Sequence, residues 1–213
     1  MLALTFDDGP NPAATPALLA LLARHEVRAS FFLVGQFARA CPQVVRDIAA
    51  RGHTIGNHTE THPNLFRMTH KAIERELTQC QESIEWAMAG MRPRVPVWMR
   101  PPFGYRGPQI SSAVRGAGLR GIVMWSRACK DWKPQTPEGL IERLGRISAM
   151  PDSGPGAEQG RGEVLLLHDG DFRRNGSERG NLLHALGYWL PRWREAGVNF
   201  VTIDEIASAT ARK

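Results

Sequence analysis

Short, β-prone apolar runs alternate with segments of helical periodicity along the chain, and this alternation limits the fold more than any other feature. The β-prone runs cover residues 2–6, 29–34, 54–56, 97–100, 121–125, 163–167 and 199–202. The helical patterns cover residues 16–25, 42–51, 70–89, 109–116, 137–148, 179–195 and 203–211. Because strands separated by helices pair in parallel, the alternation predicts an α/β fold of seven parallel strands with helical crossovers.

Polar side chains gather at the carboxyl ends of the β-prone runs. These residues are Asp7, Asp8, Asn57, His58, Arg100, Trp125 and His168. In a β/α barrel the carboxyl ends of all strands meet on one rim, whereas an open doubly wound sheet collects its site at one switch point. We therefore expect a closed or nearly closed β/α barrel, with residues 1–213 forming a single domain.

Composition excludes several classes of protein. The 213 residues are 42% hydrophobic and 23% charged, as in ordinary globular proteins. The net charge of +6 comes from scattered basic residues without a nucleic-acid-binding motif, so no nucleic-acid partner is expected. No apolar run approaches the roughly 20 residues of a membrane helix. Residues 151–162 are rich in Pro and Gly and are typical of a surface loop.

The first residues lack the basic and apolar regions of a signal peptide. We therefore expect a cytoplasmic protein, or else a domain cut from a longer envelope or secreted protein. The expected oligomeric state is a monomer.

Two adjacent carboxylates, Asp7 and Asp8, end the first strand. Neighbouring carboxylates repel each other, so they rarely stand at the edge of a core for stability alone. A bound cation resolves the conflict, with one Asp as ligand and the other as a nearby base. Gly9-Pro10 turns the chain, so the two side chains need not face opposite sides. The alternative is an Asp-Gly turn with a solvated neighbour.

A second cluster follows the third run. His58 and His62 are four residues apart, so one short helical turn would stack them and let them share a metal ion. Pro63 requires that this turn be short. With Asp8 they make a set of two His and one carboxylate, which suits catalytic zinc and also non-haem iron. An isolated HxxxH pair without a metal is the alternative.

Three further segments carry candidate chemistry. Arg100 opens a proline-stiffened loop and could hold a carboxylate bidentately, while the Phe103 N–H could face an oxyanion. His168 ends a buried strand and is a candidate general acid. Leu166 points to the same side of that strand. Trp132 could stack on a sugar ring. The alternatives are a surface Arg, a core Trp and a His that only caps its strand.

Taken together, these segments resemble the polysaccharide deacetylases of carbohydrate esterase family four. The runs that match its motifs, in order, are TFDDGP, NHTETHP, RPPFGY, WSRACKDW and LLLHDG. The resemblance covers essentially the whole chain. It implies a distorted (β/α)7 barrel that removes acetyl groups from an acetylated oligo- or polysaccharide, such as chitooligosaccharide or peptidoglycan.

The resemblance also implies roles for single residues. Asp8, His58 and His62 would hold a divalent metal, most often Zn²⁺, with Co²⁺ or Mn²⁺ as alternatives. The other implied roles are Asp7 as general base, Arg100 as its tether, His168 as general acid, Asp131 as the partner of His168, and Phe103, Tyr105, Trp132 and Leu166 as substrate-binding residues. The fourth motif departs from the family pattern, because Ala128 stands where an Asp is usual.

Three other functions remain open on the sequence. The same ligand set could serve a non-haem iron oxygenase. The change at Ala128 keeps open a non-catalytic, carbohydrate-binding relic of the fold. An O-acetyl esterase of the acetylxylan type would use the same site on an easier bond.

Overall fold

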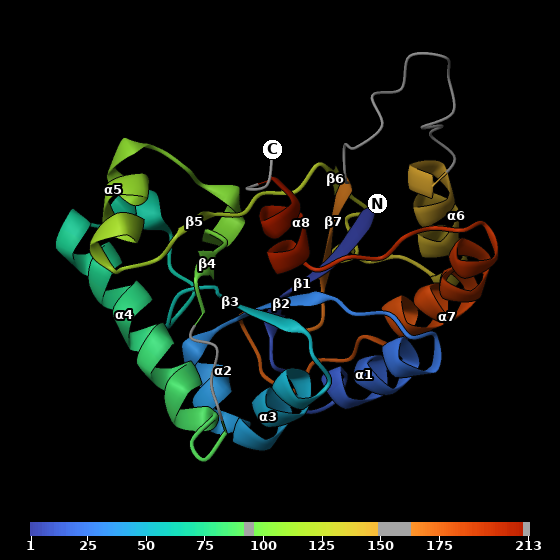
Figure 1. Ribbon diagram of the computed structural model, residues 1–213, viewed down its shortest axis with the longest axis horizontal. Coiled ribbons are helices and arrows are strands. Elements are labelled where there is room, and N and C mark those ends of the chain that lie inside the picture. Colours follow the sequence, from blue (N-terminus) through green and yellow to red (C-terminus); the bar gives the residue numbers. More distant parts are fainter. Residues whose placement is uncertain (92–95, 149–162, 211–213) are drawn as a thin grey trace.

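The computed structural model describes residues 1–91, 96–148 and 163–210. Its strands are β1 (Leu2–Gly9), β2 (Ser30–Leu33), β3 (Thr54–Asn57), β4 (Trp98–Met99), β5 (Gly121–Ile122), β6 (Arg127–Ala128) and β7 (Glu163–His168). These strands run parallel in one sheet of order β5-β4-β3-β2-β1-β7-β6. The sheet curls into a half-barrel with helices around it (Figure 1), which confirms the predicted distorted (β/α)7 barrel.

The helices expected from the sequence are all found in the described residues. The helices are α1 (Thr15–Arg24), α2 (Gly35–Ala40), α3 (Pro42–Ala50), α4 (His70–Ala87), α5 (Pro108–Gly116), α6 (Pro137–Ser148), α7 (Gly180–Glu195) and α8 (Ile203–Thr210). Two 3₁₀ turns, η1 (Leu65–Arg67) and η2 (Pro102–Gly104), follow β3 and β4. Sequence reasoning missed α2, because six residues are too few to reveal a helical period.

Side chains of β1 alternate between two apolar layers. Leu4 and Phe6 face the surrounding helices, and Phe6 stacks on Phe31 of β2 at 5.1 Å between ring centroids. Ala3 faces the interior of the half-barrel, where it packs with Phe32 and with Ile203 of α8. Figure 1 accordingly shows α8 inside the ring of the other helices. Apolar packing therefore fills the barrel interior at its amino end.

The prediction of a strand at residues 199–202 is wrong. Phe200 makes only an isolated bridge to Leu2, supported by the hydrogen bonds from Leu2 N–H to the Asn199 carbonyl and from Val201 N–H to the Leu2 carbonyl. The reason is that β2 and β7 already flank β1 and leave only its first residues free on one side. The seventh strand is instead β6, which lies inside the fourth motif.

One connection lacks a helix. β5 and β6 form opposite edges of the sheet, yet only residues 123–126 join them. This segment is pinned at both ends: Val123 N–H donates to the Met99 carbonyl of β4, and Ser126 N–H donates to the Val164 carbonyl of β7. The two edges are therefore bridged by four residues of chain.

Two further expectations concern a surface loop and membrane-spanning helices. The surface loop predicted at residues 151–162 lies outside the described residues. In the described part of the chain, none of the helices has the length and apolar character needed to cross a membrane.

Candidate active site

Asp7 and Asp8 both face the carboxyl end of the barrel, although they are neighbours on β1. Asp7 continues the inward face of Ala3 and Thr5, and it lies in register with His168 of β7. Asp8 would face outward in a regular strand, but its φ of 70° is left-handed and the register with β2 shifts between Asp7 and Gly9. This bulge turns both carboxylates into one site. The reversal thus occurs at Asp8, one residue before the predicted Gly9-Pro10 turn.

His58 and His62 come from the loop after β3, and this loop is not the helical turn that their spacing suggested. Thr59 and His62 have φ of 69° and 56°. Asn57 Oδ1 accepts a hydrogen bond from Thr59 N–H at 2.9 Å, and Thr59 Oγ1 accepts one from His62 N–H at 3.1 Å. These side chains replace the helical hydrogen bonds and hold the two imidazoles with 4.9 Å between ring centroids.

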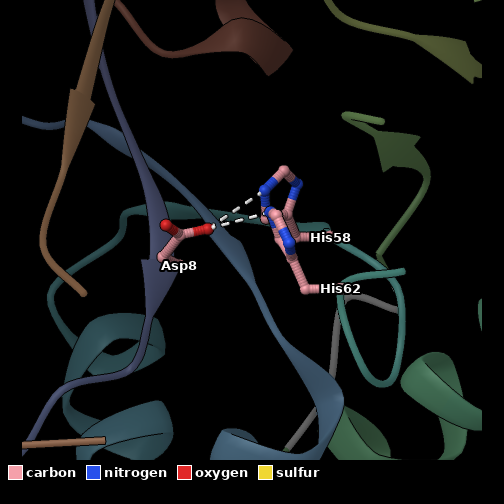
Figure 2. A group of neighbouring side chains, drawn as sticks. All are labelled: Asp8, His58 and His62. Atoms are coloured by element: carbon pink, nitrogen blue, oxygen red, sulfur yellow. Dashed lines mark ion pairs between the residues drawn. The ribbon is translucent and has the colours of Figure 1, made fainter. Parts of the chain in front are cut away.

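Asp8, His58 and His62 offer three ligand atoms that lie within 4.8 Å of one another. Figure 2 shows the Asp8 carboxylate pointing toward both imidazole rings. Asp8 Oδ1 lies 3.4 Å from His58 Nε2 and 3.3 Å from His62 Nε2. All three residues are buried, so the three atoms converge on one enclosed point.

The donor set fits a divalent cation. Asp8 Oδ1 is buried without a hydrogen-bond partner, which a fold tolerates rarely unless another group satisfies that atom. His58 Nδ1 is bonded to the Arg100 carbonyl at 2.7 Å, which fixes the ring with Nε2 toward the centre. Burial, with the neighbouring His58, lowers the pKa of His62 to about 3, so its imidazole is in the neutral, ligating form.

The carboxylate of Asp8 is also held in its ligating form. Burial by itself would raise the pKa of Asp8, but the neighbouring imidazoles of His58, His168 and His62 lower it further than burial raises it. The pKa of Asp8 therefore lies well below the ordinary range. The three residues together match the two-nitrogen, one-oxygen donor set of catalytic zinc sites.

Arg100 holds Asp7 from inside the barrel. Its guanidinium is fully buried over the ring of Phe32, 4.2 Å from the ring centroid. One nitrogen donates to Asp7 Oδ1 at 2.8 Å and also to Thr5 Oγ1 at 2.7 Å. The pairing is therefore a single hydrogen bond to the carboxylate, not the bidentate fork expected from the sequence. A buried charge pair of this kind keeps the Asp7 carboxylate in one orientation.

His168 and Asp131 form a second buried pair across the site. His168 Nδ1 lies 3.0 Å from Asp131 Oδ1, and His168 N–H donates to Asp131 Oδ2 at 2.8 Å. Burial alone would lower the pKa of His168. The charge and hydrogen bond of Asp131, with smaller contributions from Asp7 and Asp8, instead raise it to about 9. The imidazolium form is therefore stable at neutral pH.

A cavity of about 430 Å³ joins these groups. It is lined by Asp7, Asp8, His58, His62, Pro101, Phe103, Gly104, Trp125, Trp132, Leu166, His168, Asp171, Phe172, Arg173 and Arg179. Arg100 and Asp131 stand behind Asp7 and His168, each in contact with the residue it was predicted to support. Tyr105 is not a lining residue, although its ring lies 5.6 Å from that of Phe103.

Ala128, where the sequence departs from the family pattern, pairs with Leu166 of β7 and does not line the cavity. Leu166 and His168 both line the cavity, which confirms that these alternate residues of β7 share one side.

Sequence reasoning missed the wall formed by the loop after His168. Phe172 stacks on the His62 ring at 4.0 Å, and Asp171, Arg173 and Arg179 complete this wall. A signal was available, because the segment directly follows a strand end and loops at that position form the rim of a barrel. The residue types alone did not mark it.

Comparisons with known proteins agree with this geometry. The family model described as polysaccharide deacetylase matches residues 1–122. A chitooligosaccharide deacetylase from Azorhizobium caulinodans is 35% identical over 203 residues, which cover 91% of this chain and 88% of that protein. A peptidoglycan-N-acetylglucosamine deacetylase from Bacillus cereus is 28% identical over 208 residues, which cover 97% of this chain and 87% of that protein.

Solved structures give the same assignment. A family 4 carbohydrate esterase from Streptomyces lividans in complex with acetate superposes with a TM-score of 0.75 at 27% identity, covering 93% of this chain and 90% of that one. A carbohydrate esterase family 4 pseudoenzyme from Bacillus anthracis has a TM-score of 0.77 at 25% identity, covering 97% of this chain and 64% of that one. The chain therefore belongs to the polysaccharide deacetylases, carbohydrate esterase family 4.

Proposed function

We propose that the protein is a metal-dependent hydrolase that removes N-acetyl groups from an acetylated amino-sugar oligomer, such as chitooligosaccharide or peptidoglycan, and releases acetate. One observation carries the proposal: the Asp8–His58–His62 cluster lies between two buried charge pairs, Asp7–Arg100 and His168–Asp131, in one cavity. This arrangement supplies a Lewis-acid position, a base and an acid, which are the groups that amide hydrolysis needs.

Asp8, His58 and His62 would hold the metal. Two imidazoles and one carboxylate suit Zn²⁺, and Co²⁺ or Mn²⁺ could replace it. When bound, such an ion lowers the pKa of water and polarises the acetamide carbonyl. The chain itself contributes the orientation of the ligands, through the hydrogen bond between His58 and the Arg100 carbonyl.

Asp7 is the proton acceptor in this proposal. The hydrogen bond from Arg100 fixes the position of the Asp7 carboxylate, so it can take the proton of the attacking water. Phe103 lines the same cavity, where its backbone N–H would stabilise the developing oxyanion. Trp132 and Leu166 would enclose the acetyl group, since both line the cavity. The ring centroids of Trp132 and His168 are 5.1 Å apart.

His168 is the proton donor. Its pKa of about 9 keeps it protonated at neutral pH, so it can pass a proton to the leaving amine nitrogen. Asp131 accepts from Nδ1, which leaves Nε2 as the nitrogen available to the substrate.

We expect one divalent ion per chain and loss of hydrolysis when it is removed. Dialysis against a chelator should abolish acetate release, and addition of Zn²⁺ or Co²⁺ should restore it, because the three buried ligands leave coordination positions for water and substrate. Elemental analysis and acetate assays on the same samples make the measurement. Fully active protein that contains no metal would contradict the proposal.

Replacement of Asp131 should move the pH dependence of the reaction. The negative charge of Asp131 raises the pKa of His168, so Asp131→Asn should lower that pKa. The alkaline limb of kcat/KM, which reports the essential acid, should move down by about one pH unit. Activity should fall most at mildly alkaline pH, where the variant loses its proton and the wild type retains it.

Ala128→Asp is the matched control, because it adds a carboxylate to the same motif at a position that does not line the cavity. Its alkaline limb should stay near that of the wild type. An unmoved limb in Asp131→Asn, with normal folding and metal content, would assign the role to another group. Asp169→Asn would then be the next variant to titrate, because Asp169 directly follows His168.

Similarity to a family 4 pseudoenzyme gives weight to one alternative, a carbohydrate-binding protein without catalysis. Acetate release across acetylated chitin oligomers, peptidoglycan and xylan, with controlled metal, separates the possibilities. Release from xylan alone would indicate an O-acetyl esterase. Sugar binding with a full metal site but no release from any substrate would indicate the binding protein.

A further inference from the structure

A row of aromatic rings leads from His62 out of the cavity. The ring centroids of Phe103 and His62 are 4.7 Å apart, and those of Tyr105 and Phe103 are 5.6 Å apart. Phe66 stacks on Tyr105 at 4.5 Å with an interplanar angle of 29°. Phe66 and Tyr105 do not line the cavity, so the row extends the aromatic surface beyond it.

The outer end of this row is fixed by the fold. Phe66 lies in η1, where its N–H donates to Asn64 Oδ1 at 3.1 Å. Leu65, its neighbour, is buried in an apolar cluster to which Tyr105 also packs. Leu65 therefore anchors the turn, while 62% of Phe66 remains exposed. A large ring held in place before binding loses little conformational entropy when a ligand packs against it.

Two other exposed aromatic side chains, Trp86 and Tyr188, each have an arginine beside the ring. Trp86 on α4 is 54% exposed and has the Arg39 guanidinium 5.8 Å from its ring centroid. Tyr188 on α7 has Arg192 3.6 Å from its ring centroid. These rings carry an arginine over their surface, whereas Phe66 continues a row of rings that begins at the metal ligands. Exposed apolar surface that adjoins a polar site is typical of ligand binding.

We infer that Phe66 and Tyr105 form a second sugar-binding position, which takes the sugar next to the one being deacetylated. The C–H face of a pyranose packs well on an aromatic face, and aromatic rings provide large apolar contact areas. The row is continuous with the cavity, because Phe103 lines the cavity and its ring neighbours that of Tyr105. Its occupant is therefore a neighbouring sugar of the same chain. This inference rests on the proposed function and adds which residues hold the neighbouring sugar of the oligomer.

The test compares a substrate that reaches Phe66 with one that does not. We would measure kcat/KM for acetylated chitotetraose and for an aryl acetate, and take their ratio. In Phe66→Ala this ratio should fall about fivefold, and Phe66→Tyr should restore most of it because the ring is retained. Trp86→Ala, which removes another largely exposed ring, on α4, should leave the ratio unchanged.

A binding measurement separates this inference from the proposed function. Calorimetry of chitotetraose with Asp7→Asn, with and without Phe66→Ala, reports affinity without turnover, and the second change should weaken binding about fivefold. An unchanged ratio and unchanged affinity in an active enzyme would overturn the second position alone. An equal loss on both substrates would also overturn it, since it would indicate a damaged turn. Absence of acetate release from every substrate by the wild type would refute the proposed function instead.

Discussion

Asp7→Asn should retain its metal and lose catalysis by roughly 10²- to 10⁴-fold, which is the usual contribution of a general base. The asparagine keeps the shape of the side chain and its contact with Arg100, but it cannot accept the proton of water. Asp7 Oδ2 lies 3.9 Å from His58 Nε2, farther than either separation that joins Asp8 to the two histidines. Loss of the Asp7 charge therefore leaves the three ligands in place.

Asp8→Asn is the matched variant, because it makes the same chemical change one residue along β1. It should weaken metal affinity, and excess Zn²⁺ should restore part of its activity. Metal content by elemental analysis and kcat at saturating substrate and Zn²⁺ distinguish the two variants. Equal metal loss in both would refute the division of roles between base and ligand.

Arg100→Met should be the most destabilising single change in the site. Methionine keeps most of the volume over Phe32, but it leaves the Asp7 carboxylate buried without its cation and Thr5 Oγ1 without a donor. Breaking one partner of a buried pair costs about 3–5 kcal/mol in the free energy of unfolding. Urea denaturation of the metal-loaded protein measures this cost.

The double variant Asp7→Asn/Arg100→Met tests the cause. If the unpaired carboxylate is the source, removal of its charge should recover a large part of the lost stability. Arg146→Met is the control, since Arg146 pairs with Glu142 on an exposed surface of α6 and should change stability little. A double variant no more stable than Arg100→Met alone would assign the loss to packing over Phe32.

The sequence was sufficient to predict that Asp8, His58 and His62 lie close together, because side chains able to bind a metal stand there at or after strand ends. Asp8, His58 and His62 lie at ends of parallel strands, and those ends meet on one rim whatever the details of the loops. Their convergence could be predicted without knowing the backbone. Their local geometry could not, because the left-handed conformations of Asp8, Thr59 and His62 depend on the bulge in β1 and on hydrogen bonds from Asn57 and Thr59.

The seventh strand shows why local pattern has limits. Residues 199–202 are β-prone, but a strand also needs a free edge, and β1 offers only its first residues. β6 has two residues and a neutral pattern, yet it pairs with β7 because that edge is free. Likewise, the residue types of 171–179 do not indicate a cavity wall. Only the position of this loop after β7 places Phe172 against His62.

The helix-free connection from β5 to β6 has a mechanical consequence. Residues 123–126 act as a tether of fixed length, because five peptide steps from Ile122 to Arg127 can span at most roughly 18 Å. The two sheet edges cannot move farther apart than this tether allows, although no ladder of hydrogen bonds joins them within the described residues. The covalent chain therefore sets the upper limit on how far the barrel can open at this seam, where Trp125 borders the cavity.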